Sequence, residues 1–302
     1  RLTRSLALQW SARIHENAGD GRTAFAEIAE ALSAWPPEDG IWARAITQMT
    51  LAQLSAQRGD IRTGASHAAL ALPDLLLLQA TDDAIDARAI MAVAALADGD
   101  IAAAEAFVAA NAAGVDNPWV FGGAVVNLSV EAEIALARGD IAVGLARYRQ
   151  MAAAMQRSVG ALPGGGDGPA PWALYGLAAA TCAHAIHGEG EDLYDELAAQ
   201  VPGQLASPRP DFPILGLVLF ALALAGLQHD RIDTEVAIGL LALADRFSYA
   251  RLAPSSSWEN AEVLLASRGL DEQLAEAVER LGDRRGAALL DELHDLIARL
   301  ER

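Results

Sequence analysis

The chain has 302 residues, of which 53% are hydrophobic and 5% aromatic, and its formal net charge is −18. This acidic balance disfavours direct binding to nucleic acid or to an anionic membrane, because both need clustered cations. All 22 basic residues are arginine, which excludes lysine-dependent phosphate loops and Schiff bases. The single cysteine, Cys182, excludes an intrachain disulfide. We expect no cofactor.

Four Gly-Asp pairs recur every 40 residues in the first half of the chain. They are Gly19-Asp20, Gly59-Asp60, Gly99-Asp100 and Gly139-Asp140. Glycine adopts the positive φ that ends a helix, and aspartate then caps the free N–H groups of the next helix. A helix-Gly-Asp-helix unit at this interval is typical of a helical-hairpin solenoid. We therefore predict an all-α fold.

Small residues keep a fixed register around these turns. Seven residues before each turn glycine stand Ala12, Ala52, Ala92 and Ala132, and five residues after it stand Ala24, Gly64, Ala104 and Gly144. We expect the paired helices to approach most closely at these positions. The pattern resembles the tetratricopeptide repeat, which implies a right-handed superhelix. That family usually repeats at 34 residues, so an interval of 40 predicts helices about one turn longer.

Helical patterning continues to the end of the chain. We predict one repeat domain over 1–302, with regular hairpins in 1–157, a Gly/Pro loop in 158–171, degenerate hairpins in 172–250 and capping helices in 251–302. The apolar run at 214–227 is too short to span a membrane and predicts a buried core helix, and 202–213 is predicted as a connection. The predicted helices are 2–17, 21–34, 41–58, 61–79, 82–98, 101–114, 118–138, 141–158, 172–187, 190–200, 213–228, 232–249, 257–268, 270–281 and 284–301.

Few residues suggest chemistry. His184 and His187 share a helical face, while Cys182 points elsewhere, so a two-histidine metal site is geometrically possible, although a hairpin turn with polar helix ends explains the same residues. The glycines of 164–168 are not preceded by a strand and do not form a phosphate loop. No set of residues converges as a nucleophile and base. We therefore predict no catalytic residues and no metal.

Six tryptophans stand near predicted helix starts or turns rather than at core spacing. Trp35 and Trp42 flank a proline-rich connection. These side chains could line a ligand or partner surface, or they could pack as plugs between loops.

The predicted binding surface follows the first helix of each hairpin, which lines the concave face in superhelices of this type. Six residues before each turn glycine stand Arg13, Gln53, Val93 and Glu133, and three of the four are polar. We predict a groove for a peptide, a partner helix or a neighbouring domain, with Arg13 as a carboxylate or phosphate clamp. A solvated face without a ligand is the alternative. The predicted groove contains Gln9, Trp10, Arg13, Gln53 and Glu133.

A second resemblance lies in the last third of the chain. It rests on 244–249, on Pro254-Ser255 with Trp258 and Ala261, and on 282–286 before 289–292. These residues resemble the C-terminal region of actinobacterial transcriptional regulators of the Streptomyces antibiotic regulatory protein type, AfsR among them. In that family a winged-helix segment, a bacterial activator domain and commonly a nucleotide-binding switch ATPase precede a tetratricopeptide-like module.

The resemblance implies a non-enzymatic, cytoplasmic interaction or effector-sensing domain, whose partners include the upstream domains of its own polypeptide. The helical pattern already under way at Arg1 fits a C-terminal piece of a longer protein. Two alternatives stay open: a freestanding scaffold or adaptor unrelated to transcription, and an enzyme with a helical-repeat fold.

Overall fold

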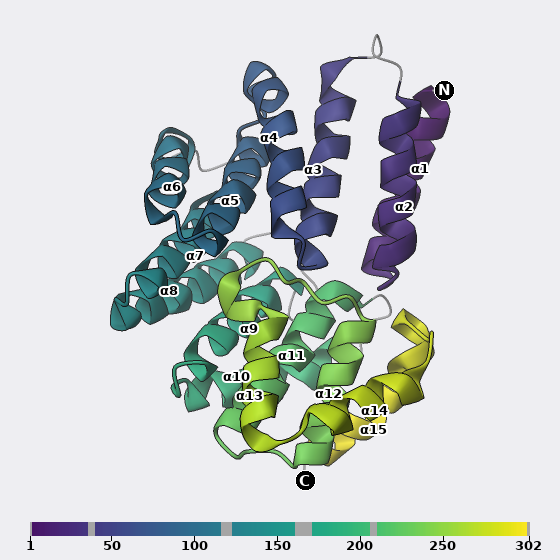
Figure 1. Ribbon diagram of the computed structural model, residues 1–302, viewed down its shortest axis with the longest axis vertical. Coiled ribbons are helices and arrows are strands. Elements are labelled where there is room, and N and C mark those ends of the chain that lie inside the picture. The colour runs from purple at the N-terminus through teal and green to yellow at the C-terminus, as the bar shows by residue number, and fades with distance from the viewer. Residues whose placement is uncertain (1, 36–39, 116–122, 161–170, 206–209, 301–302) are drawn as a thin grey trace. The chain divides into compact units, whose positions relative to one another are not determined.

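The computed structural model describes residues 2–35, 40–115, 123–160, 171–205 and 210–300. This part of the chain is all-helical, without strands (Figure 1). It forms two compact units, one comprising 1–16, 21–147 and 252–254, and the other 17–20, 148–251 and 255–302. The boundary falls inside a helix, between Arg147 and Tyr148, and not at the Gly/Pro-rich segment. The single repeat domain stays a prediction.

The first unit consists of helices that pack in neighbouring pairs. The predicted helices in this region are confirmed to within a few residues at each end. The observed helices are α1 (Leu2–Asn17), α2 (Gly21–Ala34), α3 (Ile41–Gln57), α4 (Ile61–Leu77), α5 (Thr81–Ala97), α6 (Ile101–Val115), α7 (Gly123–Ala137) and α8 (Ile141–Gly160), the last of which continues into the second unit.

The turn glycines have the predicted backbone conformation. Their φ angles are 78° at Gly19, 84° at Gly59, 78° at Gly99 and 84° at Gly139. After Gly59, the amide of Asp60 donates to the carbonyl of Ser55 over 2.9 Å, which satisfies a helix-end acceptor as in the Schellman motif. The turns at Gly99 and Gly139 make the same bond. One backbone device therefore ends α3, α5 and α7.

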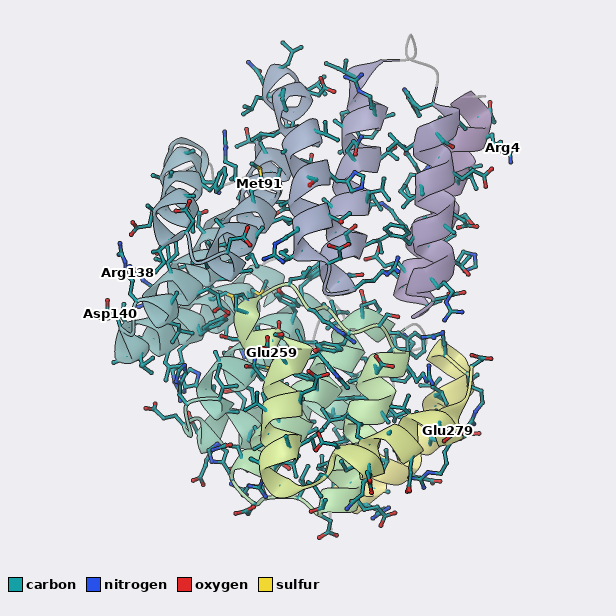
Figure 2. The ribbon with its side chains drawn as sticks, in the orientation of Figure 1. Arg4, Met91, Arg138, Asp140, Glu259 and Glu279 are labelled. Carbon is teal, nitrogen blue, oxygen red and sulfur yellow. The ribbon has the colours of Figure 1, made fainter. Side chains whose placement is uncertain are left out.

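Aspartate caps the helix that follows in two of these turns. The Asp60 carboxylate accepts from the amide of Thr63 over 3.1 Å, and that of Asp100 accepts from Ala103 over 2.9 Å. Hydrogen bonding to Thr63 is the main cause that lowers the pKa of Asp60. Figure 2 shows Arg138 and Asp140, the residues before and after the turn glycine Gly139. Arg138 forms an ion pair with Glu105 at 2.5 Å.

The small residues lie where the paired helices meet. All four alanines before the turns and the four small residues after them are buried. A Cβ added to Gly64 would stand 2.9 Å from the carbonyl oxygen of Ala52, and one on Gly144 would stand 3.0 Å from that of Ala132. The first separation is shorter than real Cβ atoms show, and the second is tighter than nine in ten real Cβ contacts, so either substitution requires the backbone to move. The predicted close-approach register is confirmed.

The second unit is built around the predicted core helix. In α11 (Phe212–Gln228) every residue from Phe212 to Leu227 is buried, and none of the described helices combines the length and apolar character needed to cross a bilayer. Phe220 stacks on Tyr249 with ring centroids 4.5 Å apart. The other elements are α9 (Pro171–Ala185), α10 (Glu191–Leu205), α12 (Thr234–Arg246), η1 (Pro254–Ser256), α13 (Trp258–Arg268), α14 (Asp271–Leu281), η2 (Gly286–Leu289) and α15 (Leu290–Leu300).

Several boundaries in the second unit differ from the prediction, among them that of the last helix, predicted over 284–301, which is η2 followed by α15. Pro202 was predicted in a connection but lies inside α10, two residues after the predicted end of that helix. Helix α9 begins at Pro171, and α10 ends at Leu205. Residues 206–209 of the predicted connection lie outside the described part of the chain. A proline late in a helix removes one amide donor while the preceding turns remain hydrogen-bonded, so composition alone placed this helix end too early.

The 40-residue rhythm also persists in the second unit. Gly188, Asp230 and Gly269 all have positive φ, at 71°, 52° and 68°, at intervals close to 40 residues. The amide after each one bonds back to the preceding helix, as in the first unit. Asp230 replaces glycine, which is why the sequence pattern looked degenerate here.

Candidate functional site

The polar residues of α1 divide between two roles. Gln9 points toward the neighbouring hairpin, because its Nε2 donates to the carbonyl of Ala43 over 3.2 Å and to the hydroxyl of Thr47 in α3. Thr47 is buried, and its hydroxyl also donates to Ala43. Gln9 therefore joins α1 to α3, so its amide is already engaged within the fold.

Arg13 is exposed and electrostatically coupled to α5. Burial raises the pKa of Asp83, and the charge of Arg13 lowers it again in part. The charge of Arg13 on α1 therefore acts on a carboxyl of α5. Trp10 is 70% exposed, and because it directly follows Gln9 in α1, its side chain points in a different direction around the helix.

The other predicted groove residues lie in different surroundings. Gln53 is half-buried on α3. Glu133 on α7 is only 4% exposed. Val93, at the same register in α5, is buried as well. The structure therefore relates Arg13 to the acidic start of α5, and it does not gather Gln9, Trp10 and Glu133 on one open surface.

Three aspartates at the start of α5 form a group that the sequence analysis overlooked. They are Asp82, Asp83 and Asp86. Burial, together with the charges of Asp83 and Asp82, raises the pKa of Asp86 to about 7. Asp82 is shifted in the same direction, by burial and then by Asp83. Their spacing of three and four residues, which puts them on one side of a helix, was the signal available in the sequence.

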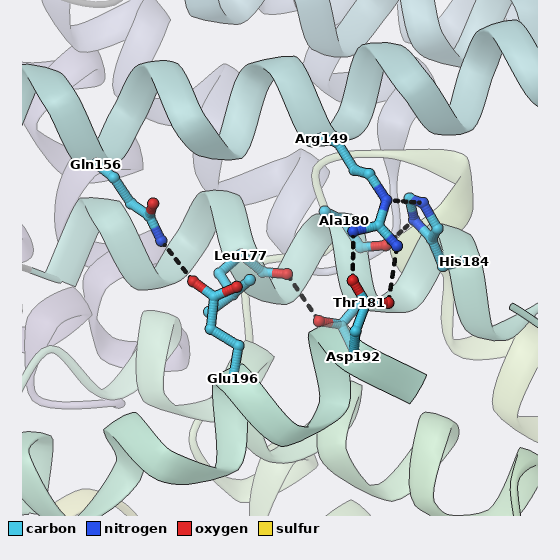
Figure 3. Close-up of polar contacts among 8 residues, drawn as sticks. All are labelled: Arg149, Gln156, Leu177, Ala180, Thr181, His184, Asp192 and Glu196. Carbon is cyan, nitrogen blue, oxygen red and sulfur yellow. Dashed lines mark hydrogen bonds and ion pairs between the residues drawn. The ribbon is translucent and has the colours of Figure 1, made fainter. Parts of the chain in front are cut away.

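A second polar cluster joins α8, α9 and α10 in the second unit (Figure 3). Arg149 forms a bidentate ion pair with Asp192, with N–O distances of 2.7 and 2.8 Å. Its Nε also donates to Nε2 of His184 over 3.1 Å. The Nδ1 of His184 donates to the carbonyl of Ala180 over 2.8 Å, which fixes the neutral tautomer. Burial lowers the pKa of His184.

The structure also shows the surroundings of Cys182, His184 and His187, the residues considered above for a metal site. Both ring nitrogens of His184 are engaged within the protein, Cys182 is buried, and His187 is exposed at the helix end. Across the described ranges, no three His, Cys, Asp or Glu side chains are arranged to hold a metal ion. The geometry makes His184 a bridge between helices, because a ligand nitrogen would need a free lone pair.

The tryptophans have no common environment. Trp35 is buried, with no hydrogen-bond partner for its Nε1, whereas Trp42 is exposed on α3. Trp172 is exposed, and Trp258 packs on Phe220 and Tyr249. Trp119 lies outside the described residues. Loop plugging fits Trp35, and an open surface fits Trp10 and Trp42.

The described surface of the first unit carries both charged and apolar side chains. Arg13 and the α5 aspartates are the charged part, and exposed side chains on α1 are the apolar part. Comparison of the chain with protein-family models, with curated proteins and with solved structures gave no match.

Proposed function

We propose that the chain is a non-catalytic protein-interaction module built as a tetratricopeptide-like solenoid. The support is the recurrence of one hairpin: the same helix-ending turn, the same buried small residues and the same 40-residue interval. Repeats of this kind place the first helices of successive hairpins along a continuous surface, and such surfaces bind extended partners.

The recurring hairpin is the observation that carries the proposal, and the charges on its helices indicate what kind of partner would bind, since the charge of Arg13 lowers the pKa of Asp83. A guanidinium on the first hairpin and carboxylates on the third would receive a partner with charges of both signs. Arg13 would bind a carboxylate by paired hydrogen bonds. Asp83 and Asp86, whose ionised forms are disfavoured by burial, would gain from a cationic side chain placed beside them.

The proposed partner is another domain of the same polypeptide. This part rests on the resemblance of the last third of the chain to actinobacterial regulators, in which a module of this type follows DNA-binding and ATPase segments. In that setting the module acts in the cytoplasm, as an interaction or effector-sensing domain. The DNA-binding activity would belong to those other segments.

A calorimetric titration tests the surface. The chain is titrated with the remaining domains encoded by the same gene, as wild type and as the double variant Arg13→Ala, Gln53→Ala. We expect at least tenfold weaker binding by the variant, about 1.4 kcal/mol. Arg22→Ala is the matched control, since Arg22 is an exposed arginine on a second helix. Unchanged affinity of the double variant would reject this face.

The gene itself separates the proposal from the freestanding scaffold. A winged-helix or Walker sequence encoded with this chain favours the regulator. A gene that encodes only helical repeats favours the scaffold, and the titration would then be repeated with proteins that co-purify with the chain.

A further inference from the structure

One stripe of α1 stands out because it is exposed where the corresponding stripes of α3, α5 and α7 are covered. The stripe consists of Thr3, Ala7, Trp10 and Ile14, at helical spacings of four, three and four residues. Trp10 is 70% exposed and Ile14 is 68% exposed, and Thr3 and Ala7 are exposed too. We call these four residues the α1 stripe.

The register of the turns identifies the equivalents of the α1 stripe. Trp10 and Ile14 stand nine and five residues before the turn glycine Gly19. The residues at the same two positions are Thr50 and Leu54 in α3, and Val130 and Ile134 in α7. Those four residues are buried. Ala7 likewise corresponds to the buried residues Thr47, Ala87 and Asn127. The α1 stripe therefore occupies positions that other hairpins use for packing.

The covering element is the second helix of the preceding hairpin. Leu54 of α3 packs in one cluster with Ala24, Ile28 and Ala31 of α2. Val130 and Ile134 of α7 pack with residues of α5 and α6, among them Ala104 and Phe107. In α5, Ile90 packs against the cluster shared by α3 and α4. Each first helix in the unit thus receives a helix that presents small and aliphatic residues along one side.

From this repetition we propose that the α1 stripe is a docking site for an amphipathic partner helix of the α2 type. That helix would present a small residue followed by aliphatic residues at spacings of three and four, and would run antiparallel to α1. The exposed area includes a large aromatic side chain, and its burial is the main source of stabilisation expected on binding. The α1 stripe does not contain Arg13 or Gln53, the residues changed in the titration above, so its test can fail or succeed independently of that one.

Charge around the α1 stripe favours a partner helix over a second copy of the chain. Arg13 is exposed beside Trp10 and Ile14, and α2, the model for the occupant, carries Glu27 and Glu30. Glu30 already pairs with Arg4 across α1 and α2. Two copies meeting through their α1 helices would instead bring like-charged Arg13 residues together, and each copy carries a net charge of −18.

A labelled peptide with the sequence of residues 21–34 is the probe. It is held helical by a side-chain cross-link between positions 22 and 26, which are exposed in α2, because a free peptide of this length is marginally helical. Fluorescence anisotropy measures its binding to the full chain. We expect saturable binding that is weakened at least tenfold by Ile14→Glu, and also when the peptide carries Ile28→Glu.

Val143→Glu is the matched control, because Val143 is an exposed aliphatic residue on α8. It should leave binding unchanged, and circular dichroism should show that both variants keep the wild-type melting temperature. Absent binding, or binding that Ile14→Glu does not weaken, overturns the proposal. So does a wild-type dimer in sedimentation equilibrium that Ile14→Glu converts to a monomer, since the occupant would then be a second copy.

Discussion

The carbonyl oxygen of Ala52 lies 2.9 Å from the point that a Cβ on Gly64 would occupy. This distance ties α3 to α4 at their closest approach, because the helix backbones meet there without an intervening side chain. Gly144 and Ala132 repeat the relationship two 40-residue intervals later, at 3.0 Å. The small residues are therefore a steric requirement of the hairpin. Their exchange for larger residues should lower the free energy of unfolding.

Gly64→Ala should destabilise the protein by about 1–3 kcal/mol, the usual cost of overpacking. The substitution also raises helix propensity by up to about 1 kcal/mol, so a net loss shows that the steric term is the larger one. Urea unfolding followed by circular dichroism measures the change. A net gain in stability would contradict the close approach of α3 and α4.

Ala92→Leu tests the same register with a larger side chain in α5. Ala92 is fully buried, whereas Ala109 on α6 is exposed. We expect Ala92→Leu to lower the melting temperature clearly and Ala109→Leu to leave it nearly unchanged. Equal tolerance at both positions would mean that the register of small residues is not a packing constraint.

The turn glycines should respond to backbone conformation alone. No atom lies within 4 Å of a Cβ built on Gly99, whose φ is 78°. Gly99→Ala should therefore cost about 1 kcal/mol, the penalty of the left-handed region for a residue with a Cβ, and Gly99→Asn should cost less because asparagine tolerates that region better. Chemical denaturation of both variants compares the two costs.

Stability should fall as pH rises through the range of Asp86. Its pKa is about 7 in the folded protein and near 3.8 when unfolded, so between these values the folded state holds the extra proton. Stability then decreases with rising pH, by up to about 1.4 kcal/mol per pH unit for one group. Asp82 and Asp83 act in the same direction.

The variant Asp86→Asn removes this titration and should flatten the stability profile between pH 4 and 7. Asp98→Asn, an exposed aspartate paired with Arg62, is the control. If denaturation midpoints of wild type and Asp86→Asn keep a constant difference over that range, Asp86 does not titrate there.

The cluster of Arg149, His184 and Asp192 should respond unequally to removal of its members. The ion pair is largely exposed, so Asp192→Ala should cost less than about 1 kcal/mol. Arg149→Ala should cost more, about 1–3 kcal/mol, because it leaves the buried Nε2 of His184 without a donor. Arg62→Ala, which removes another exposed pair, is the control. Equal losses in all three variants would exclude a role for the histidine contact.

The sequence predicted the helices, their turns and the close-approach residues, because these depend on local rules: glycine at positive φ, aspartate as a cap, alanine at a contact. The turn at Asp230 was predicted only as a degenerate copy, because an aspartate stands where the other turns have glycine, yet it adopts the same positive φ. The end of α10 was missed because a proline near a helix end is tolerated. The groove was harder to predict, since Gln53 and Glu133 share the periodic position of Arg13, but their surroundings depend on which neighbouring helix packs against them.

The arginine ion pairs of this fold have a mechanical consequence. Arg62 pairs with Asp98, Arg231 with Asp195 and Arg268 with Asp230, and the partners stand 36 to 38 residues apart. Each ion pair therefore joins two neighbouring hairpins. It breaks when either of these two hairpins is unfolded by force. A chain pulled at both ends should lengthen in discrete steps, each releasing about 40 residues or roughly 140 Å of extended backbone.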